Sequence, residues 1–193
     1  MEFSHRFEEA FLMANRLHAG QHRKKSPLPY IVHLMGVAVL VAEYGGDEDQ
    51  VIAAFLHDAV EDQGGAATRE QIRRRFGDRV TRMVDDCTDT DKTPKPPWKP
   101  RKQAYIDHLE HEAAEDSLLV SAADKLYNVR TIIAGLREHG DQFFDRFSAK
   151  KEGTLWYYRE LVECFTRRGP QPIAEHLSRA VDQLERLATQ RDM

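Results

Sequence analysis

Residues 51–62 read VIAAFLHDAVED, an apolar run that leads directly into the ionisable residues His57, Asp58, Glu61 and Asp62. Helical spacing places Glu61 one turn beyond His57, and Asp62 one turn beyond Asp58. A carboxylate that is buried needs a cation or hydrogen-bond donors beside it, and a metal ion would supply that charge. The alternative is that Glu61 and Asp62 face water at a frayed helix end while His57 packs in the core.

Two other segments favour a metal site. His33 lies amid the apolar residues YIVHLM, and Asp124 follows the apolar run LLVSAA. Considered alone, His33 would be a core histidine, and Asp124 would pair with Lys125 or Arg130 at the surface. Taken together, two histidines and two aspartates in apolar settings form a mixed nitrogen and oxygen set that suits Mn, Fe or Zn, and Mg less well.

The apolar period is helical along almost the whole chain, and no segment predicts a strand. Residues 88–100 contain four of the eight prolines, which excludes a continuous helix there and predicts one long loop of functional interest. We therefore expect an all-α fold. Its helices are predicted near residues 7–17, 30–44, 48–60, 68–76, 78–87, 102–114, 117–138, 150–166 and 172–188, with Asp47 capping the third helix and a capping box beginning at Thr68.

Composition narrows the class of protein. The chain has 193 residues, 41% hydrophobic and 31% charged, with a formal net charge of −4, which suits a soluble globular protein and argues against a general nucleic-acid coat. The chain contains no run of about 20 apolar residues, which is the length that a membrane span needs. Residues 1–10 do not resemble a signal peptide. Cys87 and Cys164 form no zinc-finger or disulfide pattern, so we expect a cytoplasmic protein. Its oligomeric state is left open.

The ordered pattern of His33, His57-Asp58 and Asp124 resembles the HD superfamily of metal-dependent phosphohydrolases. Four segments more particularly resemble the hydrolase domain of RelA/SpoT proteins and the free-standing small alarmone hydrolases. They read PYIVH at 29–33, HDAVED at 57–62, FGDRV at 76–80 and ADKLYNVR at 123–130.

This resemblance implies an HD-domain helical bundle in a single domain, 1–193. The motif-bearing part spans about 5–135, and C-terminal helices within 140–190 complete the bundle. The resemblance also implies a divalent metal, most often Mn²⁺. Its ligands by position would be His33, His57, Asp58 and Asp124.

The implied reaction is removal of pyrophosphate from the 3′ position of guanosine tetra- or pentaphosphate. By position, Glu61 and Asp62 would orient and deprotonate the attacking water. The implied contacts to the substrate are Arg23 and Lys24 at its phosphates, and Asn128 and Thr131 near its nucleoside. The alternative for Arg23 and Lys24 is a solvated basic loop, and that for Asn128 and Thr131 is ordinary polarity on a helix surface.

Departures from the family surround the expected substrate. Leu28 and Leu34 stand where the family has Gly and Pro, and Gln63 stands where Thr is common. A second hypothesis is therefore an HD-type phosphatase acting on NADPH, a deoxynucleotide or an adenosine analogue of the alarmone. A third is a non-catalytic helical protein that binds a nucleotide or a partner, against which the pair Glu61 and Asp62 argues. The aromatic residues at 143–144 and 156–158 are expected in the core rather than in a base-stacking wall.

Overall fold

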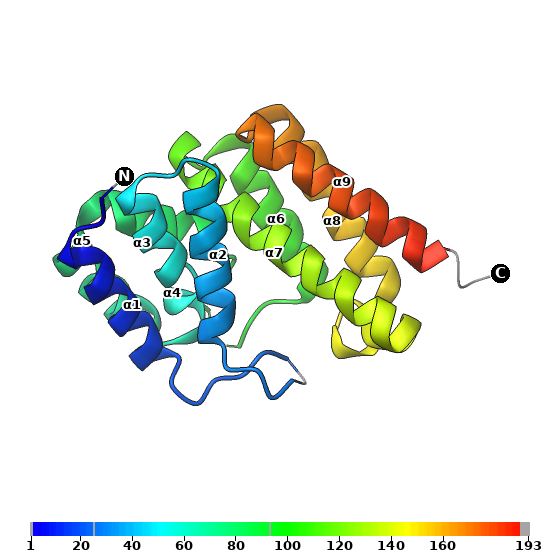
Figure 1. The fold of residues 1–193 in the computed structure, drawn as a ribbon, viewed down its shortest axis with the longest axis horizontal. Coiled ribbons are helices and arrows are strands. Elements are labelled where there is room, and N and C mark those ends of the chain that lie inside the picture. Colours follow the sequence, from blue (N-terminus) through cyan, green and yellow to red (C-terminus); the bar gives the residue numbers. More distant parts are fainter. Residues whose placement is uncertain (1, 25, 93, 190–193) are drawn as a thin grey trace.

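The computed structural model describes residues 2–24, 26–92 and 94–189, and over these ranges it is helical without a β-strand (Figure 1). This confirms the all-α prediction. The elements are α1 (His5–Leu17), α2 (Ile31–Glu43), α3 (Glu48–Leu56), α4 (Ala59–Asp62), α5 (Gly65–Cys87), α6 (Trp98–His111), α7 (Glu115–His139), the 3-10 helix η1 (Gly140–Arg146), α8 (Lys150–Arg168) and α9 (Gln171–Thr189).

Helix α7 is the central element of the fold. It packs against α2, α3 and α5 on one side and against α8, α9 and η1 on the other, as Figure 1 shows. Leu118 and Leu126 of α7 are fully buried, and burying a side chain of this size stabilises the fold by roughly 1.5–3 kcal/mol. The buried apolar residues form one continuous cluster from Ala10 in α1 to Ala188 in α9.

Two glycines let aromatic rings approach helix backbones closely. A Cβ atom on Gly36 of α2 would lie 2.0 Å from Cε2 of Tyr127, and one on Gly135 of α7 would lie 2.2 Å from Cε2 of Phe143. Gly36 therefore fixes how closely α2 packs against α7. This matters for the site below, because α2 carries His33 and α7 carries Asp124.

Several helix ends follow the local sequence signals. Helix α2 stops before Gly45, whose φ of 83° lies in the left-handed region that favours glycine. Asp47 caps α3 through a reciprocal capping box with Gln50, as predicted. Gly77, with φ 88° and ψ 175°, interrupts α5 at the predicted boundary.

Other boundaries differ from the prediction. The third helix ends at Leu56 rather than near residue 60, because the chain turns at His57 and Asp58 and restarts as the short helix α4. The capping box predicted at Thr68 is wrong. Helix α5 already begins at Gly65 after the left-handed Gly64, and the Thr68 side chain hydrogen-bonds the Gln63 carbonyl instead.

The proline-rich segment is shorter than predicted, since α6 begins at Trp98 within it. Pro100 sits in the first turn of α6, where a missing N–H removes no helical hydrogen bond. The η1 helix was not predicted. The aromatic side chains of 143, 144, 157 and 158 are buried, and Trp156 is half-buried. Three of them, Phe143, Tyr157 and Tyr158, also line the cavity described below, so their burial leaves the stacking alternative open.

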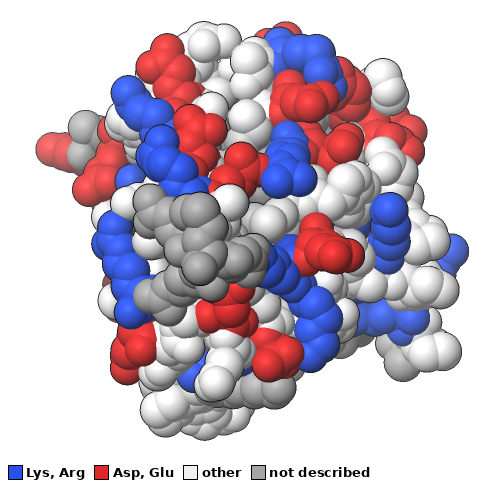
Figure 2. All heavy atoms as spheres, turned by 90° about the vertical axis from the view of Figure 1, so that its right-hand side faces the viewer, with Lys and Arg blue, Asp and Glu red and all other residues white. Residues whose placement is uncertain are grey.

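Surface charge is mixed on the face that lies to the right in Figure 1. Figure 2 shows Lys and Arg interspersed with Asp and Glu there, without a continuous field of one sign. Among the described helices, none combines the length and the apolar character that crossing a bilayer requires.

The close contact at Gly36 predicts that Gly36→Ala destabilises the fold. The added methyl group would force the Tyr127 ring away, and overpacking of this kind costs about 1–3 kcal/mol, against a helix-propensity gain of roughly 1 kcal/mol. Urea unfolding should therefore show a lower midpoint. Val39→Ala on the same helix is the control, because Val39 is 55% exposed and its loss should change the midpoint little. A midpoint for Gly36→Ala at or above that of the wild type would contradict the packing account.

Candidate metal centre and active site

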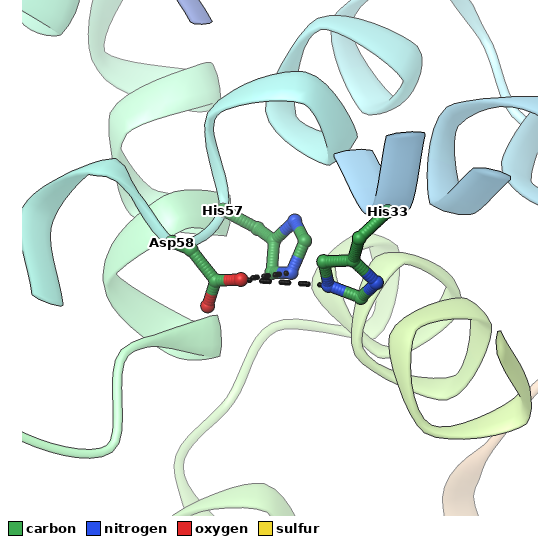
Figure 3. Close-up of side chains that lie close together, drawn as sticks. All are labelled: His33, His57 and Asp58. Atoms are coloured by element: carbon green, nitrogen blue, oxygen red, sulfur yellow. Dashed lines mark ion pairs between the residues drawn. The ribbon is translucent and has the colours of Figure 1, made fainter. Parts of the chain in front are cut away.

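Four side chains from distant segments meet beneath a cavity. His33 comes from α2, His57 and Asp58 from the turn between α3 and α4, and Asp124 from the middle of α7. The His57 Nε2 atom lies 3.0 Å from Asp58 Oδ2 and 3.6 Å from Asp124 Oδ1, and His33 Nε2 lies 3.5 Å and 3.2 Å from the same two oxygens. Figure 3 shows the two imidazoles directed at the Asp58 carboxylate.

The donor set fits a divalent cation. His57 Nδ1 is 2.8 Å from the Ala54 carbonyl oxygen and must donate to it, which leaves the lone pair of Nε2 for the cluster. That Nε2 is buried and has no hydrogen-bond partner among the described residues, although two carboxylates lie close to it. Ligand atoms of His33, His57 and Asp58 all lie within 4.8 Å of one another, so these three residues could bind one ion. Asp124 approaches both imidazoles and extends this set.

The charged groups of the cluster stabilise one another against the cost of burial. Burial disfavours a charge on His57, but the Asp58 and Asp124 carboxylates outweigh burial and raise the pKa of the imidazole well above its usual value. Burial likewise disfavours charge on Asp58 and Asp124. The two imidazoles hold the pKa of the Asp58 carboxyl well below its usual range. Lys125, together with the same two imidazoles, does so for the carboxyl of Asp124. A proton on His57 thus substitutes for the positive charge that a metal would bring.

Neighbouring donors orient the two carboxylates. The Tyr30 hydroxyl donates to Asp58 Oδ2 over 2.6 Å. Lys125 Nζ donates to Asp124 Oδ2, and Asn128 Nδ2 donates to Asp124 Oδ1, each over 2.6 Å. Lys125 is 9% exposed, so it is a buried partner rather than the surface partner considered from the sequence. Such contacts fix the orientation of metal ligands.

A cavity of about 530 Å³ opens above the cluster. Of the residues expected in the site, all except His57 line it, and the His57 Nε2 atom lies 3.0 Å from the Oδ2 atom of the lining residue Asp58. The lining therefore includes both carboxylates of the expected acid pair. It also includes the four residues expected at the substrate, namely Arg23, Lys24, Asn128 and Thr131.

The four residues expected at the substrate are partly linked to other side chains. The Arg23 guanidinium donates to Asn128 Oδ1 over 2.6 Å and lies 5.5 Å from the centre of the Tyr30 ring. This contact joins the loop before α2 to α7 across the cavity. Thr131 instead bonds the Tyr127 carbonyl of its own helix. Lys24 is exposed at the cavity rim.

Glu61 and Asp62, the expected acid pair, are held by residues that sequence reasoning missed. Lys95 Nζ lies 2.7 Å from Glu61 Oε1 and 3.4 Å from Asp62 Oδ1, and Gln21 Nε2 donates to Asp62 Oδ2 over 2.9 Å. Burial, and next the nearby Asp89 carboxylate, raise the pKa of Glu61 against the opposing effect of Lys95. The available signal for Lys95 was its place in the proline-rich loop.

The same segment contributes a second buried ion pair. The side chain of Asp89 is almost fully buried and accepts hydrogen bonds from Arg101 and Lys102 at the start of α6. Asp89 and Lys102 both line the cavity. The pair therefore anchors the loop that brings Lys95 to the acid pair. Arg101 and Lys102 lie twelve and thirteen residues after Asp89, so no local sequence pattern predicts these contacts.

The Tyr30 contact predicts that Tyr30→Phe weakens metal binding. Loss of a group that orients a ligand typically lowers metal affinity about 10- to 100-fold, and Asp58 loses its hydroxyl donor in this variant. Competition with a fluorescent chelator measures the affinity. Tyr44→Phe is the matched control, because Tyr44 contacts His176 and not the cluster. Equal affinities for Tyr30→Phe and the control would remove the orienting role.

The chain resembles known proteins over most of its length. A family model described as an HD domain matches residues 10–155. The chain is 36% identical over 174 residues to guanosine-3′,5′-bis(diphosphate) 3′-pyrophosphohydrolase MESH1 of Homo sapiens, covering 83% of this chain and 93% of the relative. It is also 36% identical over 127 residues to the Aquifex aeolicus guanosine-3′,5′-bis(diphosphate) 3′-pyrophosphohydrolase, covering 65% of this chain but only 17% of that longer relative.

The fold is also found among solved structures. A structure described as "A metazoan ortholog of SpoT hydrolyzes ppGpp and plays a role in starvation responses" superposes with a TM-score of 0.76 at 23% identity, covering 95% of this chain and 97% of the other. HD domains hold a divalent metal, which agrees with the cluster formed by His33, His57 and Asp58. On its sequence and its fold, this chain belongs to the HD-domain family.

Proposed function

We propose that this chain is a metal-dependent hydrolase that removes pyrophosphate from the 3′ position of guanosine tetra- or pentaphosphate. The observation that carries the proposal is the shared cavity. The imidazole and carboxylate cluster, the acid pair and the cations Arg23 and Lys24 all border it or lie directly behind it. The names of the human and Aquifex relatives support the substrate.

In this proposal His33, His57, Asp58 and Asp124 hold one divalent ion, and the ion is Mn²⁺. Two imidazoles and two carboxylates are a donor set that Mn²⁺ accepts readily. When bound, the ion polarises a phosphoryl oxygen and lowers the pKa of a coordinated water. The hydrogen bonds from Tyr30 to Asp58 and from Lys125 to Asp124 keep the two carboxylates oriented toward the imidazoles.

Glu61 and Asp62 are the groups that orient and deprotonate the attacking water. Both border the cavity, and the partial burial that raises the pKa of Glu61 makes its carboxylate a better proton acceptor. Lys95 holds the two carboxylates side by side. Its charge also offsets their repulsion of an anionic substrate.

Arg23 and Lys24 bind the substrate phosphates, and Asn128 and Thr131 contact the nucleoside. The hydrogen bond between Arg23 and Asn128 places the phosphate and nucleoside contacts next to each other. A volume near 530 Å³ lies within the usual range for small-ligand pockets, about 300–1,000 Å³. We therefore propose that the partner is a small nucleotide rather than a nucleic acid.

The proposal treats residues 1–193 as a single HD-type domain, in which 5–135 carries the motifs and helices within 140–190 complete the bundle. The continuous core from α1 to α9 supports this. We also propose that the protein acts in the cytoplasm, which suits its two buried free cysteines.

A nucleotide panel tests the substrate. With Mn²⁺ present, we expect ppGpp to yield GDP and pyrophosphate, measured by anion-exchange chromatography. NADPH, deoxynucleotides and the adenosine analogue should react more slowly. Leu28 borders the cavity where the family carries glycine, so the panel also measures whether this change has redirected specificity. Faster turnover of another nucleotide would overturn the alarmone assignment, and no turnover of any would overturn the enzyme assignment.

His57→Ala should remove metal and activity together, because the variant loses an imidazole ligand of the proposed ion. In the wild type this imidazole is oriented by the hydrogen bond from its Nδ1 to the Ala54 carbonyl oxygen. Metal content is measured by inductively coupled plasma mass spectrometry after desalting. His111→Ala, at an exposed histidine of α6, is the control and should keep both properties. Unchanged metal content in His57→Ala would contradict the ligand assignment.

Glu61→Gln should lower kcat by about 10²- to 10⁴-fold with little change in metal content, since a general base is lost while its shape is kept. Glu112→Gln, at an exposed position of the loop after α6, is the charge-matched control. Steady-state kinetics and metal analysis of the same preparations give both readouts. If kcat of Glu61→Gln equals that of the control, Glu61 does not act on the water.

A further inference from the structure

A second cavity of about 390 Å³ lies between α7 and α9, outside the site described above. Its basic lining consists of Arg130 and Arg137 from α7 with His176 and Arg179 from α9. Ala134 of α7 lines this groove and also the catalytic cavity, so a single helix separates the two. We call the second cavity the α7–α9 groove.

Positive charge in the α7–α9 groove is not neutralised by the protein. Within the described part of the chain, no carboxylate lines the groove, and Arg130, Arg137 and Arg179 have neither an ion pair nor a hydrogen bond to another side chain. This contrasts with the arginines of α5, where Arg73 and Arg74 share Glu70. Like charges that face one cavity repel each other, so a bound anion would relieve that repulsion.

The spacing of the arginines along the two helices favours an elongated anion over a compact one. Arg130 and Arg137 are seven residues apart, so they project from the same face of α7 about 10 Å apart along its axis. Arg179 faces them from the neighbouring helix. His176 is held by a contact of its Nδ1 with the Tyr44 hydroxyl, and the two rings lie 5.5 Å apart. A single small anion would reach one arginine, whereas a chain of linked phosphates reaches more.

We infer that the α7–α9 groove binds an oligophosphate anion, either free pyrophosphate or the phosphate chain of a nucleotide. Guanidinium groups present paired donors that match phosphate oxygens, which makes three unpaired arginines a fitting recognition set. The cavity volume of about 390 Å³ falls within the usual range of small-ligand pockets, about 300–1,000 Å³. This inference does not depend on the proposed hydrolase activity.

The test measures anion binding to the full, metal-loaded protein by isothermal titration calorimetry, with pyrophosphate and GDP as separate probes. The variant is Arg137→Gln/Arg179→Gln, and the control is Arg74→Gln/Arg75→Gln on exposed positions of α5, which removes the same net charge elsewhere. We expect wild type and control to show a groove site besides any binding in the catalytic cavity. In the variant the affinity at that site should fall at least about tenfold.

Hydrolysis by the variant should equal that of the wild type, because neither arginine borders the catalytic cavity. A loss seen with pyrophosphate identifies free oligophosphate as the ligand, and a loss seen only with GDP identifies the nucleotide; both support the groove. Unchanged binding in the variant, or an equal loss in the control, would overturn the inference. A change of oligomeric state by analytical ultracentrifugation with unchanged anion binding would also overturn it, because the groove would then be a protein interface.

Discussion

The constraint on which the rest of the structure depends is the packing of two buried imidazoles against two carboxylates, with nitrogen–oxygen separations of 3.0–3.6 Å. Charged groups in an apolar interior need compensation, and the Nε2 atom of His57 faces oxygens that cannot donate to it. A proton on the imidazole compensates in part. A divalent cation would supply positive charge there and would use the lone pairs that the two imidazoles direct into the cluster.

Three packing features bring this cluster together. The turn at His57 and Asp58 ends α3 one residue before the imidazole and redirects the chain into α4. The contact between Gly36 and Tyr127 sets α2 against α7, and thereby His33 against Asp124. The Asp89 ion pair then fixes the loop that carries Lys95 to the acid pair. The packing of these elements around the cavity therefore positions its functional groups.

The positions of most helices, the helix ends at glycines and the Asp47 cap could be predicted from the sequence, because each depends on a few neighbouring residues. The turn at His57 was not, since residues 51–60 have the composition of one continuous helix and tertiary contacts decide where it breaks. Tyr30 and Lys95 were missed for a related reason. Their partners lie 28 and 34 residues away, beyond the reach of local spacing rules. Family resemblance named the residues that the structure brings together around the cavity, whereas the contacts that support them depend on the packing.

Anomalous diffraction at the manganese absorption edge, from crystals grown with Mn²⁺, tests the central claim most directly. The account predicts one strong peak within coordination distance of His33 Nε2, His57 Nε2 and a carboxylate oxygen of each of Asp58 and Asp124. A peak bound elsewhere, or none at this cluster while the imidazoles keep their present positions, would contradict it.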